Sequence, residues 1–307
     1  VPLFAIGGAF YVFYGMLTTE PMNGLLSIAL TLAGLPVFWY MKTGRKAEPK
    51  YPRLKAKYAV TAVSLLIMAM LFISIRVFDF RPEVRVATEP SLAPFSYQEK
   101  GRLNGFDIEL MDALGSRAGF KVVYVPVTFD NILDAVQNRH VDAAIASISV
   151  TDERRNMVSF THPYLSTGGL ALLVGERSPI RSVRDLTGKT VGVFKGSTAE
   201  TYASALAGIR IQSIHSKYDM VAAFNQGMVA ALIDDRPILE SQIATGKIPG
   251  GRIAEVLNRE EYAIAFSGEN RELEEKLNKA LEGMKKSGEI DALYRKWFSG
   301  RSSRERG

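Results

Sequence analysis

The segment AIASISVTDERR places hydroxyl side chains and a guanidinium close together at the end of a predicted strand. Ser147, Ser149 and Thr151 precede Arg154, which falls at a predicted helix start. Backbone N–H groups at a helix start attract anions, and an arginine can hold a carboxylate through two parallel hydrogen bonds. The spacing therefore indicates a carboxylate-binding site. Taken singly, the hydroxyls could be ordinary helix caps and the arginine a solvated surface residue.

A second strand-to-helix junction, VGVFKGSTAE, carries matching chemistry. Gly196 precedes Ser197 and Thr198 at the predicted helix start. Asp234 ends another predicted strand, where its carboxylate could receive an ammonium group, whereas Asp235 beside it could be a surface acid or a helix cap. The two junctions and the acid together favour a ligand that carries both an anionic and a cationic group.

The remaining candidate side chains give no indication of a metal site or of catalysis. Phe129 could form an apolar wall of the site or simply pack in the core. His140, His162 and His215 are far apart in sequence, and none has a metal-ligand spacing such as HExxH. The chain has no cysteine, which excludes disulfides, thiolate metal sites and cysteine nucleophiles. We expect no cofactor, no metal and no enzymatic activity.

The elements that must position these residues follow residue 81, where short β-branched runs alternate with amphipathic helical patterns. Strands are expected at 84–88, 121–127, 143–147, 190–194, 230–234 and 262–266. Helices are expected at 105–119, 198–208, 237–246 and 272–288, with Gly288 as a C-cap. This alternation predicts an α/β fold with mainly parallel sheets, in two small lobes rather than around one sheet.

The front of the 307-residue chain is different in composition. Uncharged stretches run over 1–19, 21–41 and 58–75, and each is long enough for a membrane helix of about 20 apolar residues. Three such segments do not fit a signal peptide, although buried helices of a soluble protein remain an alternative. We expect two transmembrane helices in 1–41 and a third at 58–78. A start inside an apolar run without Met suggests a fragment of a longer membrane protein.

The net charge of +6 is concentrated in one segment. Residues 42–57 carry seven basic side chains and one acidic side chain, and the rest of the chain carries 31 of each. A basic loop between two membrane spans lies in the cytoplasm by the positive-inside rule, which places everything after about residue 78 outside. The balanced remainder gives no support for nucleic-acid binding. We expect a multi-pass protein of the cell (inner) membrane.

Extended sequence matches then identify a family resemblance. From about 83 to 299 the chain resembles the family 3 polar amino-acid solute-binding proteins of ABC importers. The matching segments are VRVATEPSLAPFSY (84–97), GRLNGFDIELMDAL (101–114), ILDAVQNRHVDAAIASISVTDERRNMVSFTHPYL (132–165), RSVRDLTGKTVGVFKGST (181–198) and EIDALYRKWF (289–298). The resemblance implies a two-lobed periplasmic-binding-protein (flytrap) domain with mixed sheets over 83–300 that closes on its ligand.

The same resemblance implies lobe boundaries and ligand contacts. Lobe 1 would comprise 83–170 and 263–300, and lobe 2 would comprise 171–262, with crossing strands near 168–174 and 262–266. Arg154 matches the arginine that holds the ligand carboxylate, and Asp234 matches the acid that receives its ammonium. The other implied ligand contacts are Ser147, Ser149, Ser197, Thr198, Phe129 and Leu92.

The chain departs from the family pattern at positions that help to select the ligand side chain. Leu92 stands where the family commonly has an aromatic residue. Glu89 and Ala199 stand where other members often place an aspartate or a polar side chain. The resemblance therefore implies an amino-acid ligand without identifying which one.

The front end resembles a different family, and the two resemblances together give the functional prediction. EPMNGLLSIALTLAGLPVFWYM looks like the last membrane helix of L-type amino acid–polyamine–organocation permeases. We expect a membrane-tethered extracytoplasmic domain that binds an amino acid for transport, with the lipid bilayer, a permease in the same chain or ABC transporter subunits as partners. A ligand-sensing receptor or a dehydratase-like enzyme are the alternatives, and 301–307 reads as a disordered tail.

Overall fold

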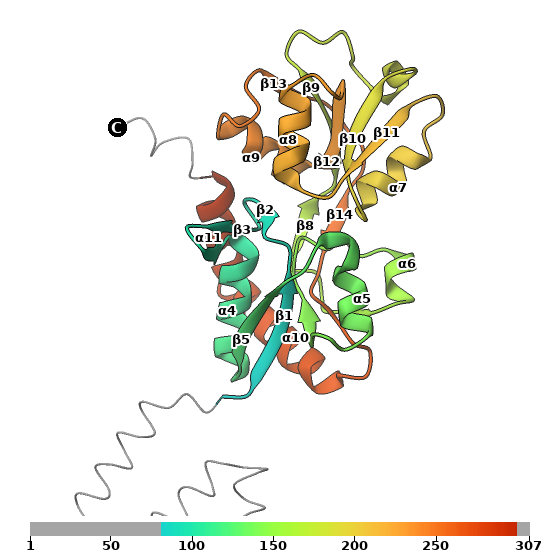
Figure 1. Cartoon of the computed structure of the whole chain (residues 1–307). Helices are drawn as coiled ribbons and strands as arrows, with labels where there is room; N and C mark the ends of the chain where they lie inside the picture. The colour runs from blue at the N-terminus through green and yellow to red at the C-terminus, as the bar shows by residue number, and fades with distance from the viewer. Residues whose placement is uncertain (1–80, 300–307) are drawn as a thin grey trace, which may run out of the picture. The chain divides into compact units, whose positions relative to one another are not determined.

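The computed structural model describes residues 81–299, and the residues from Pro82 onward form one compact unit. The predicted membrane segments 1–41 and 58–78, the basic loop 42–57 and the tail 301–307 lie outside the described residues. Within the described part, no helix combines the length and the apolar character needed to cross a membrane. The two-lobed α/β fold expected after residue 81 is confirmed, with one five-stranded sheet in each lobe (Figure 1).

Lobe 1 is built on a sheet with the strand order β5-β1-β6-β15-β7. Its strands are β1 (Glu83–Thr88), β5 (Lys121–Pro126), β6 (Ala143–Ala144), β7 (Ser159–Phe160) and β15 (Ala265–Phe266). β1 runs parallel to both β5 and β6, whereas β15 is antiparallel to β6 and β7. Its helices are α4 (Phe106–Ala118), α5 (Ile132–Gln137), α6 (Asp152–Arg155), α10 (Arg271–Lys286) and α11 (Glu289–Tyr294).

Lobe 2 has the strand order β11-β10-β12-β9-β13. The strands are β9 (Leu170–Gly175), β10 (Thr190–Phe194), β11 (Arg210–Ile214), β12 (Ala231–Asp235) and β13 (Gly251–Val256). β10 is parallel to β11 and β12, and β9 is antiparallel to β12 and β13. The helices are α7 (Thr198–Ser204), α8 (Lys217–Asn225) and α9 (Arg236–Ala244), and each packs against strands of this sheet.

Two antiparallel strands join the lobes (Figure 1). They are β8 (Leu165–Gly168) and β14 (Glu260–Tyr262), so both crossings lie a few residues before the expected 168–174 and 262–266. The expected crossing at 168–174 belongs mostly to β9, which is a strand of the lobe 2 sheet. The expected strand 262–266 divides into β14 and β15, because the chain leaves the crossing before it joins the lobe 1 sheet.

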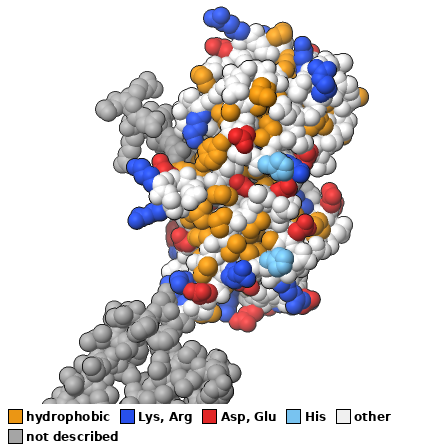
Figure 2. Space-filling model, viewed as in Figure 1, with side chains coloured by type: hydrophobic (Ala, Val, Ile, Leu, Met, Phe, Trp, Pro, Cys, Tyr) orange, Lys and Arg blue, Asp and Glu red, His pale blue; other side chains and the backbone are white. Residues whose placement is uncertain are grey.

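The remaining elements are short. A three-stranded sheet contains β2 (Ser91–Leu92), β3 (Ser96–Glu99) and β4 (Arg102–Asn104), and single turns lie at η1 (Phe129–Asn131), η2 (Val183–Leu186) and η3 (Arg295–Ser299). On the face shown in Figure 2, acidic and basic side chains are interspersed rather than gathered by sign. This face therefore has mixed charge, in agreement with the equal numbers of acidic and basic residues outside 42–57.

Helix α10 shows how the sequence pattern produces the fold. Its buried side chains recur at helical spacing and comprise Leu273, Leu277, Ala280, Leu281 and Met284. The Asn270 side chain accepts a hydrogen bond from the N–H of Leu273 and so caps the first turn. Past its other end, Gly288 adopts φ 74°, the left-handed conformation in which helices commonly terminate. The apolar face of α10 therefore packs on lobe 1, and each end of the helix is defined by a capping residue.

Candidate functional site

Arg154 lies where the two lobes meet. It belongs to the one-turn helix α6, whose Thr151 cap accepts a hydrogen bond from the Arg154 N–H at 3.2 Å. The guanidinium is buried: its Nη1 donates to the carbonyl of Ser149 at 2.9 Å and its Nη2 to the carbonyl of Gly196 at 3.1 Å. Ser149 belongs to lobe 1 and Gly196 to lobe 2, so one side chain connects both predicted junctions.

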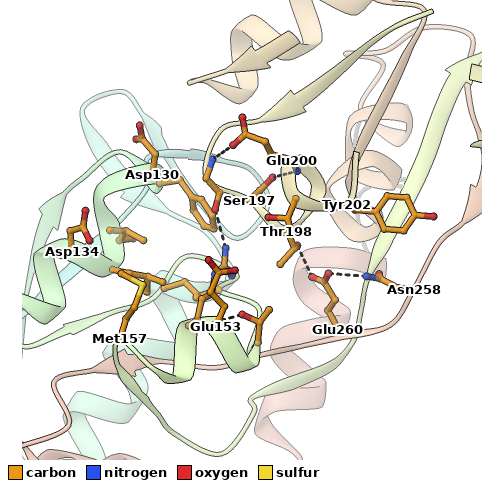
Figure 3. A pocket seen from close by; sticks show the side chains of 18 residues that line it. Asp130, Asp134, Glu153, Met157, Ser197, Thr198, Glu200, Tyr202, Asn258 and Glu260 are labelled. Carbon is orange, nitrogen blue, oxygen red and sulfur yellow. Dashed lines mark hydrogen bonds between the residues drawn. The ribbon is translucent and has the colours of Figure 1, made fainter. Parts of the chain in front are cut away.

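Glu260 of the crossing strand β14 organises the hydroxyl groups around Arg154 (Figure 3). Its carboxylate accepts hydrogen bonds from the hydroxyls of Ser149 and Thr198, the latter at 3.1 Å, and from the Asn258 amide at 3.0 Å. Burial lowers the pKa of Arg154, and the negative charge of Glu260 opposes this effect. Sequence reasoning missed Glu260, because its hydroxyl partners Ser149 and Thr198 lie 111 and 62 positions away in sequence.

A cavity of about 550 Å³ opens beside this network, with walls from both lobes (Figure 3). Its lining includes Phe129, Arg154, Thr198, Tyr202 and Glu260. The Phe129 ring forms an apolar wall, and the Arg154 Cζ lies 5.6 Å from its centroid. This volume falls within the range of small-molecule pockets, of about 300–1,000 Å³. A guanidinium, a carboxylate and an aromatic ring thus border one space.

The predicted ammonium-binding acid requires a correction. The Asp234 carboxylate is buried in an ion pair with the ammonium of Lys217, so this chain's own cation already occupies it. Asp235 is only partly buried and stands close enough to Arg154 to raise the arginine pKa. Because successive strand residues face opposite sides, only one of two adjacent acids can face the cleft. The geometry favours Asp235 for the ammonium role that the sequence analysis gave to Asp234.

Burial is also the main influence on the protonation of Asp235. Burial and the neighbouring Asp234 charge raise the pKa of Asp235, and the positive charge of Lys217 partly offsets them. A second cation placed beside this carboxyl would stabilise its ionised form. Asp235 therefore has the environment expected of an acid that gains from a cationic ligand.

The structure positions Ser147 differently from the other hydroxyls. Ser147 adopts φ 46°, which ends the expected strand 143–147 after β6, and its N–H donates to the buried Asp107 carboxylate at 2.7 Å. Among the described residues, the buried Ser147 Oγ has no hydrogen-bond partner. A left-handed conformation at a non-glycine residue is costly and often marks a functional site.

Two other expected contact residues have structural roles here. Ser197 caps α7, since its hydroxyl accepts from the Glu200 N–H at 3.3 Å and donates to the Phe194 carbonyl at 2.6 Å. This is the capping alternative that the sequence left open. Leu92, at the end of β2, is buried in the hydrophobic core rather than in the lining of the 550 Å³ cavity.

Within residues 81–299, no group of three or more His, Asp or Glu side chains is placed to hold an ion. The chemistry available is recognition: a guanidinium fork, a pair of acidic side chains, hydroxyl groups and aromatic surface. These groups suit a small molecule with a carboxylate at one point and an ammonium at another.

Comparison with known proteins gives a consistent family match. Residues 84–300 match the bacterial extracellular solute-binding proteins, family 3. The arginine-binding extracellular protein ArtP of Bacillus subtilis is 30% identical over 220 residues, which cover 70% of this chain and 86% of ArtP. A probable histidine-binding protein of Campylobacter jejuni is 27% identical over 215 residues, covering 70% of this chain and 84% of the relative.

The fold comparison agrees with the sequence matches. A solved structure of an ancestral arginine-binding protein bound to arginine superimposes with a TM-score of 0.68 at 36% identity. It covers 71% of this chain and 99% of its own. The names of these relatives describe binding proteins rather than enzymes, in agreement with the expectation of no catalysis. The match confirms the predicted resemblance for the part of the chain that contains both lobes.

Proposed function

Because this chain belongs to the bacterial extracellular solute-binding proteins of family 3, we propose that it binds a free amino acid between its lobes and serves amino-acid transport. The ligand α-carboxylate pairs with Arg154, and its α-ammonium pairs with Asp235, with Glu260 nearby. The names of the relatives support an amino acid as the class of ligand. Phe129 supplies apolar surface for the ligand body.

The bridging position of Arg154 is the observation that carries this proposal. Its two described hydrogen bonds reach carbonyl groups of opposite lobes, Ser149 and Gly196. A carboxylate is a stronger acceptor for a guanidinium than a carbonyl group, because both partners are then charged. Binding at Arg154 therefore couples occupancy of the site to the closed arrangement of the lobes.

Glu260 gives closure a second support. It accepts a hydroxyl hydrogen bond from Ser149 in lobe 1 and another from Thr198 in lobe 2. Since Glu260 itself lies on a crossing strand, each bond ties one lobe to the segment about which the lobes would move. Ligand binding would select the state in which both bonds form together.

The test is a thermal-shift and calorimetric screen of the full chain against the free amino acids. Saturating ligand should raise the unfolding temperature through mass action. Arg154→Ala should then weaken binding by more than about tenfold, which corresponds to loss of roughly 1.4 kcal/mol or more. Arg154→Lys is the matched control, because it keeps the charge but not the planar fork, and should lose affinity to an intermediate extent.

Two results would contradict the proposal. If no amino acid shifts the unfolding temperature, the chain is not an amino-acid-binding protein. If Arg154→Ala binds within threefold of the parent chain, Arg154 does not hold the carboxylate.

Membrane attachment is a further part of the proposal and rests on sequence alone. The apolar segments 1–41 and 58–78 and the basic loop 42–57 support a membrane anchor with the binding domain outside. Expressed in bacteria, the chain should sediment with membranes, and external protease should digest residues 81–299 while it spares the basic loop. Recovery of the intact chain in the soluble fraction would overturn the anchor. An ABC transporter or a permease segment of the same chain is the partner we propose for uptake.

A further inference from the structure

A second cavity lies between the lobes, away from the proposed ligand site. It has a volume of about 180 Å³ and shares no lining residue with the 550 Å³ cavity. One wall is a face of α9 in lobe 2, which includes Ser241 and Ala244. The other wall is the C-terminal end of lobe 1 and contains three aromatic side chains, Tyr294, Trp297 and Phe298. We call this space the rear cavity.

The crossing strands separate the rear cavity from the proposed ligand site. In Figure 1, α5 and α7 lie on one side of β8 and β14, whereas α9 and α11 lie on the other side. Glu260 of β14 lines the 550 Å³ cavity. The Tyr262 ring of the same strand instead contacts Phe95, with 5.6 Å between the ring centroids. Phe95 in turn contacts Phe298 of the rear cavity at 5.0 Å.

The wall in lobe 1 is firmly attached to that lobe. The Phe298 ring lies 4.6 Å from that of Tyr294 and 5.7 Å from that of the buried Phe106. The indole Nε1 of Trp297 donates a hydrogen bond to the Glu109 carboxylate of α4 at 3.1 Å. These contacts indicate that the aromatic wall moves with lobe 1.

The opposite wall is attached to the proposed ligand site of lobe 2. Helix α9 begins directly after Asp235, which we propose as the partner of the ligand ammonium. Its Ile238 and Leu239 side chains are buried, and the helix packs against β9, β12 and β13. A movement of lobe 2 therefore carries Asp235 and the rear face of α9 together.

Two rigid lobes that turn about a segment between them separate on one side of it and approach on the other. Separation of Arg154 from Gly196 would thus bring α9 toward Tyr294 and Trp297. We propose that the rear cavity is the space that α9 enters when the lobes open, so that its size limits how far the unliganded chain opens. This inference goes beyond the proposed function, because it concerns the chain without its ligand.

A change in the size of the rear cavity should change the opening in a defined direction. Ser241→Phe and Ala244→Phe each add a ring to the α9 wall, where it would occupy the space that α9 enters. Tyr294→Ala enlarges the cavity from the side of lobe 1. Ala292→Phe is the matched control, because Ala292 is exposed on α11 and does not line the rear cavity.

Two spin labels can measure the opening in the unliganded full chain. The chain has no cysteine, so Gln137→Cys on α5 and Ser204→Cys on α7 give a single labelled pair. Both residues are exposed, and neither lines the rear cavity or the 550 Å³ cavity.

The two phenylalanine variants on α9 should each shorten the mean label distance by more than about 2 Å, the scale of a domain rearrangement. Tyr294→Ala should lengthen the distance, and Ala292→Phe should leave it unchanged. Circular dichroism checks that each variant is folded, and the use of two positions on α9 protects the test against misfolding of one variant.

The inference is overturned if the folded phenylalanine variants on α9 keep the label distance of the parent chain, or if Ala292→Phe shortens it equally. Either result would show that α9 does not move into the rear cavity. The measurement uses no ligand, so its failure leaves the proposed function intact. Conversely, a chain that binds no amino acid could still show the expected changes in label distance.

Discussion

At the residue scale, the site depends on which of two adjacent acids faces the cleft. Asp234 and Asp235 have the same chemistry and end the same strand, β12. The sequence indicates an acid at this place but does not specify the orientation, because a shift of one residue exchanges the two faces of a strand. In the structure, the buried Lys217 pairs with Asp234, and the charge of Asp235 acts to raise the pKa of Arg154.

The two acids should therefore respond differently to removal of their charge. Asp235→Asn should weaken amino-acid binding by more than about tenfold, because the ligand ammonium loses its ionised partner. Asp234→Asn should instead reduce the free energy of unfolding by about 3–5 kcal/mol, because it leaves Lys217 buried without a counter-charge. Calorimetric titration and urea unfolding of both variants measure these effects. Equal loss of affinity in both would refute the assignment.

Asp107 gives a pH prediction at the same scale. Burial raises the pKa of Asp107 to about 7, against 3.8 for the ordinary side chain. Between these values the folded chain keeps a proton that the unfolded chain releases, so this group makes the free energy of unfolding fall as pH rises from about 4 to about 7. The fall amounts to at most about 4 kcal/mol.

Asp107→Asn can still accept the Ser147 N–H but does not titrate. Urea unfolding at pH 4.5, 6 and 7.5 should therefore show a flatter pH dependence in the variant than in the parent chain. Parallel curves for the two proteins would show that Asp107 ionises at its ordinary pKa when folded.

At the element scale, hydrophobic periodicity predicted part of the scaffold. The expected strand 190–194 coincides with β10, and the expected helix 105–119 contains α4 (Phe106–Ala118) with one residue to spare at each end. The pattern could not show that the expected strand 143–147 would end after two residues as β6. Ser147 adopts a left-handed conformation there, and its N–H contacts the Asp107 carboxylate, which is distant in sequence. The pattern also missed the helices α5, α6, α8 and α11, and the first residue of α8 supplies the buried lysine.

The site residues also differ in whether a local sequence pattern or a contact distant in sequence defines their role. Arg154 could be predicted, because a local motif and a family resemblance both mark it. Glu260 and Lys217 could not, because their roles come from contacts with residues distant in sequence: Glu260 with Ser149, and Lys217 with Phe194 and Ser91. The spacing of residues within each segment does not indicate these contacts.

The close approach of the two crossing segments predicts that Gly169 cannot be replaced without cost. Gly169, just after β8, has φ 137°, and a Cβ there would stand 2.3 Å from the Asn258 carbonyl oxygen near β14. Gly169→Ala should lower the free energy of unfolding by more than about 2 kcal/mol, through backbone strain and this clash. Gly175→Ala, where a Cβ meets nothing within 4 Å, is the matched control and should cost less than about 1 kcal/mol. Similar losses in urea unfolding would refute the argument.

At the scale of the whole molecule, closure is maintained by contacts between lobes that the sequence does not place. Arg154 reaches Gly196 across the cleft, and Lys217 reaches Ser91. Asp130 of lobe 1 adds an ion pair, with its carboxylate 3.6 Å from the Lys195 ammonium of lobe 2. The paired residues are 42 to 126 positions apart in sequence, and nothing in their local spacing marks them as partners across a cleft.

The Asp130–Lys195 pair predicts a salt-sensitive contribution to closure. Lys195 is partly exposed, so the pair is worth little energy and is screened by salt. Asp130→Asn should shift the unliganded chain toward the open state at low ionic strength, which small-angle scattering detects as a larger radius of gyration. The difference from the parent should shrink at about 1 M salt, where the screening length is about 3 Å.

Glu269→Gln is the matched control, because Glu269 pairs with Arg139 on the exposed surface of lobe 1 and its loss leaves the contact between lobes intact. Scattering from this variant should match the parent chain at both salt concentrations. If Asp130→Asn also matches the parent at low salt, the pair does not support closure, and the closed arrangement depends instead on the buried contacts of Arg154, Glu260 and Lys217. The two variants together thus separate the effect of a charge pair between the lobes from the effect of a surface charge pair within lobe 1.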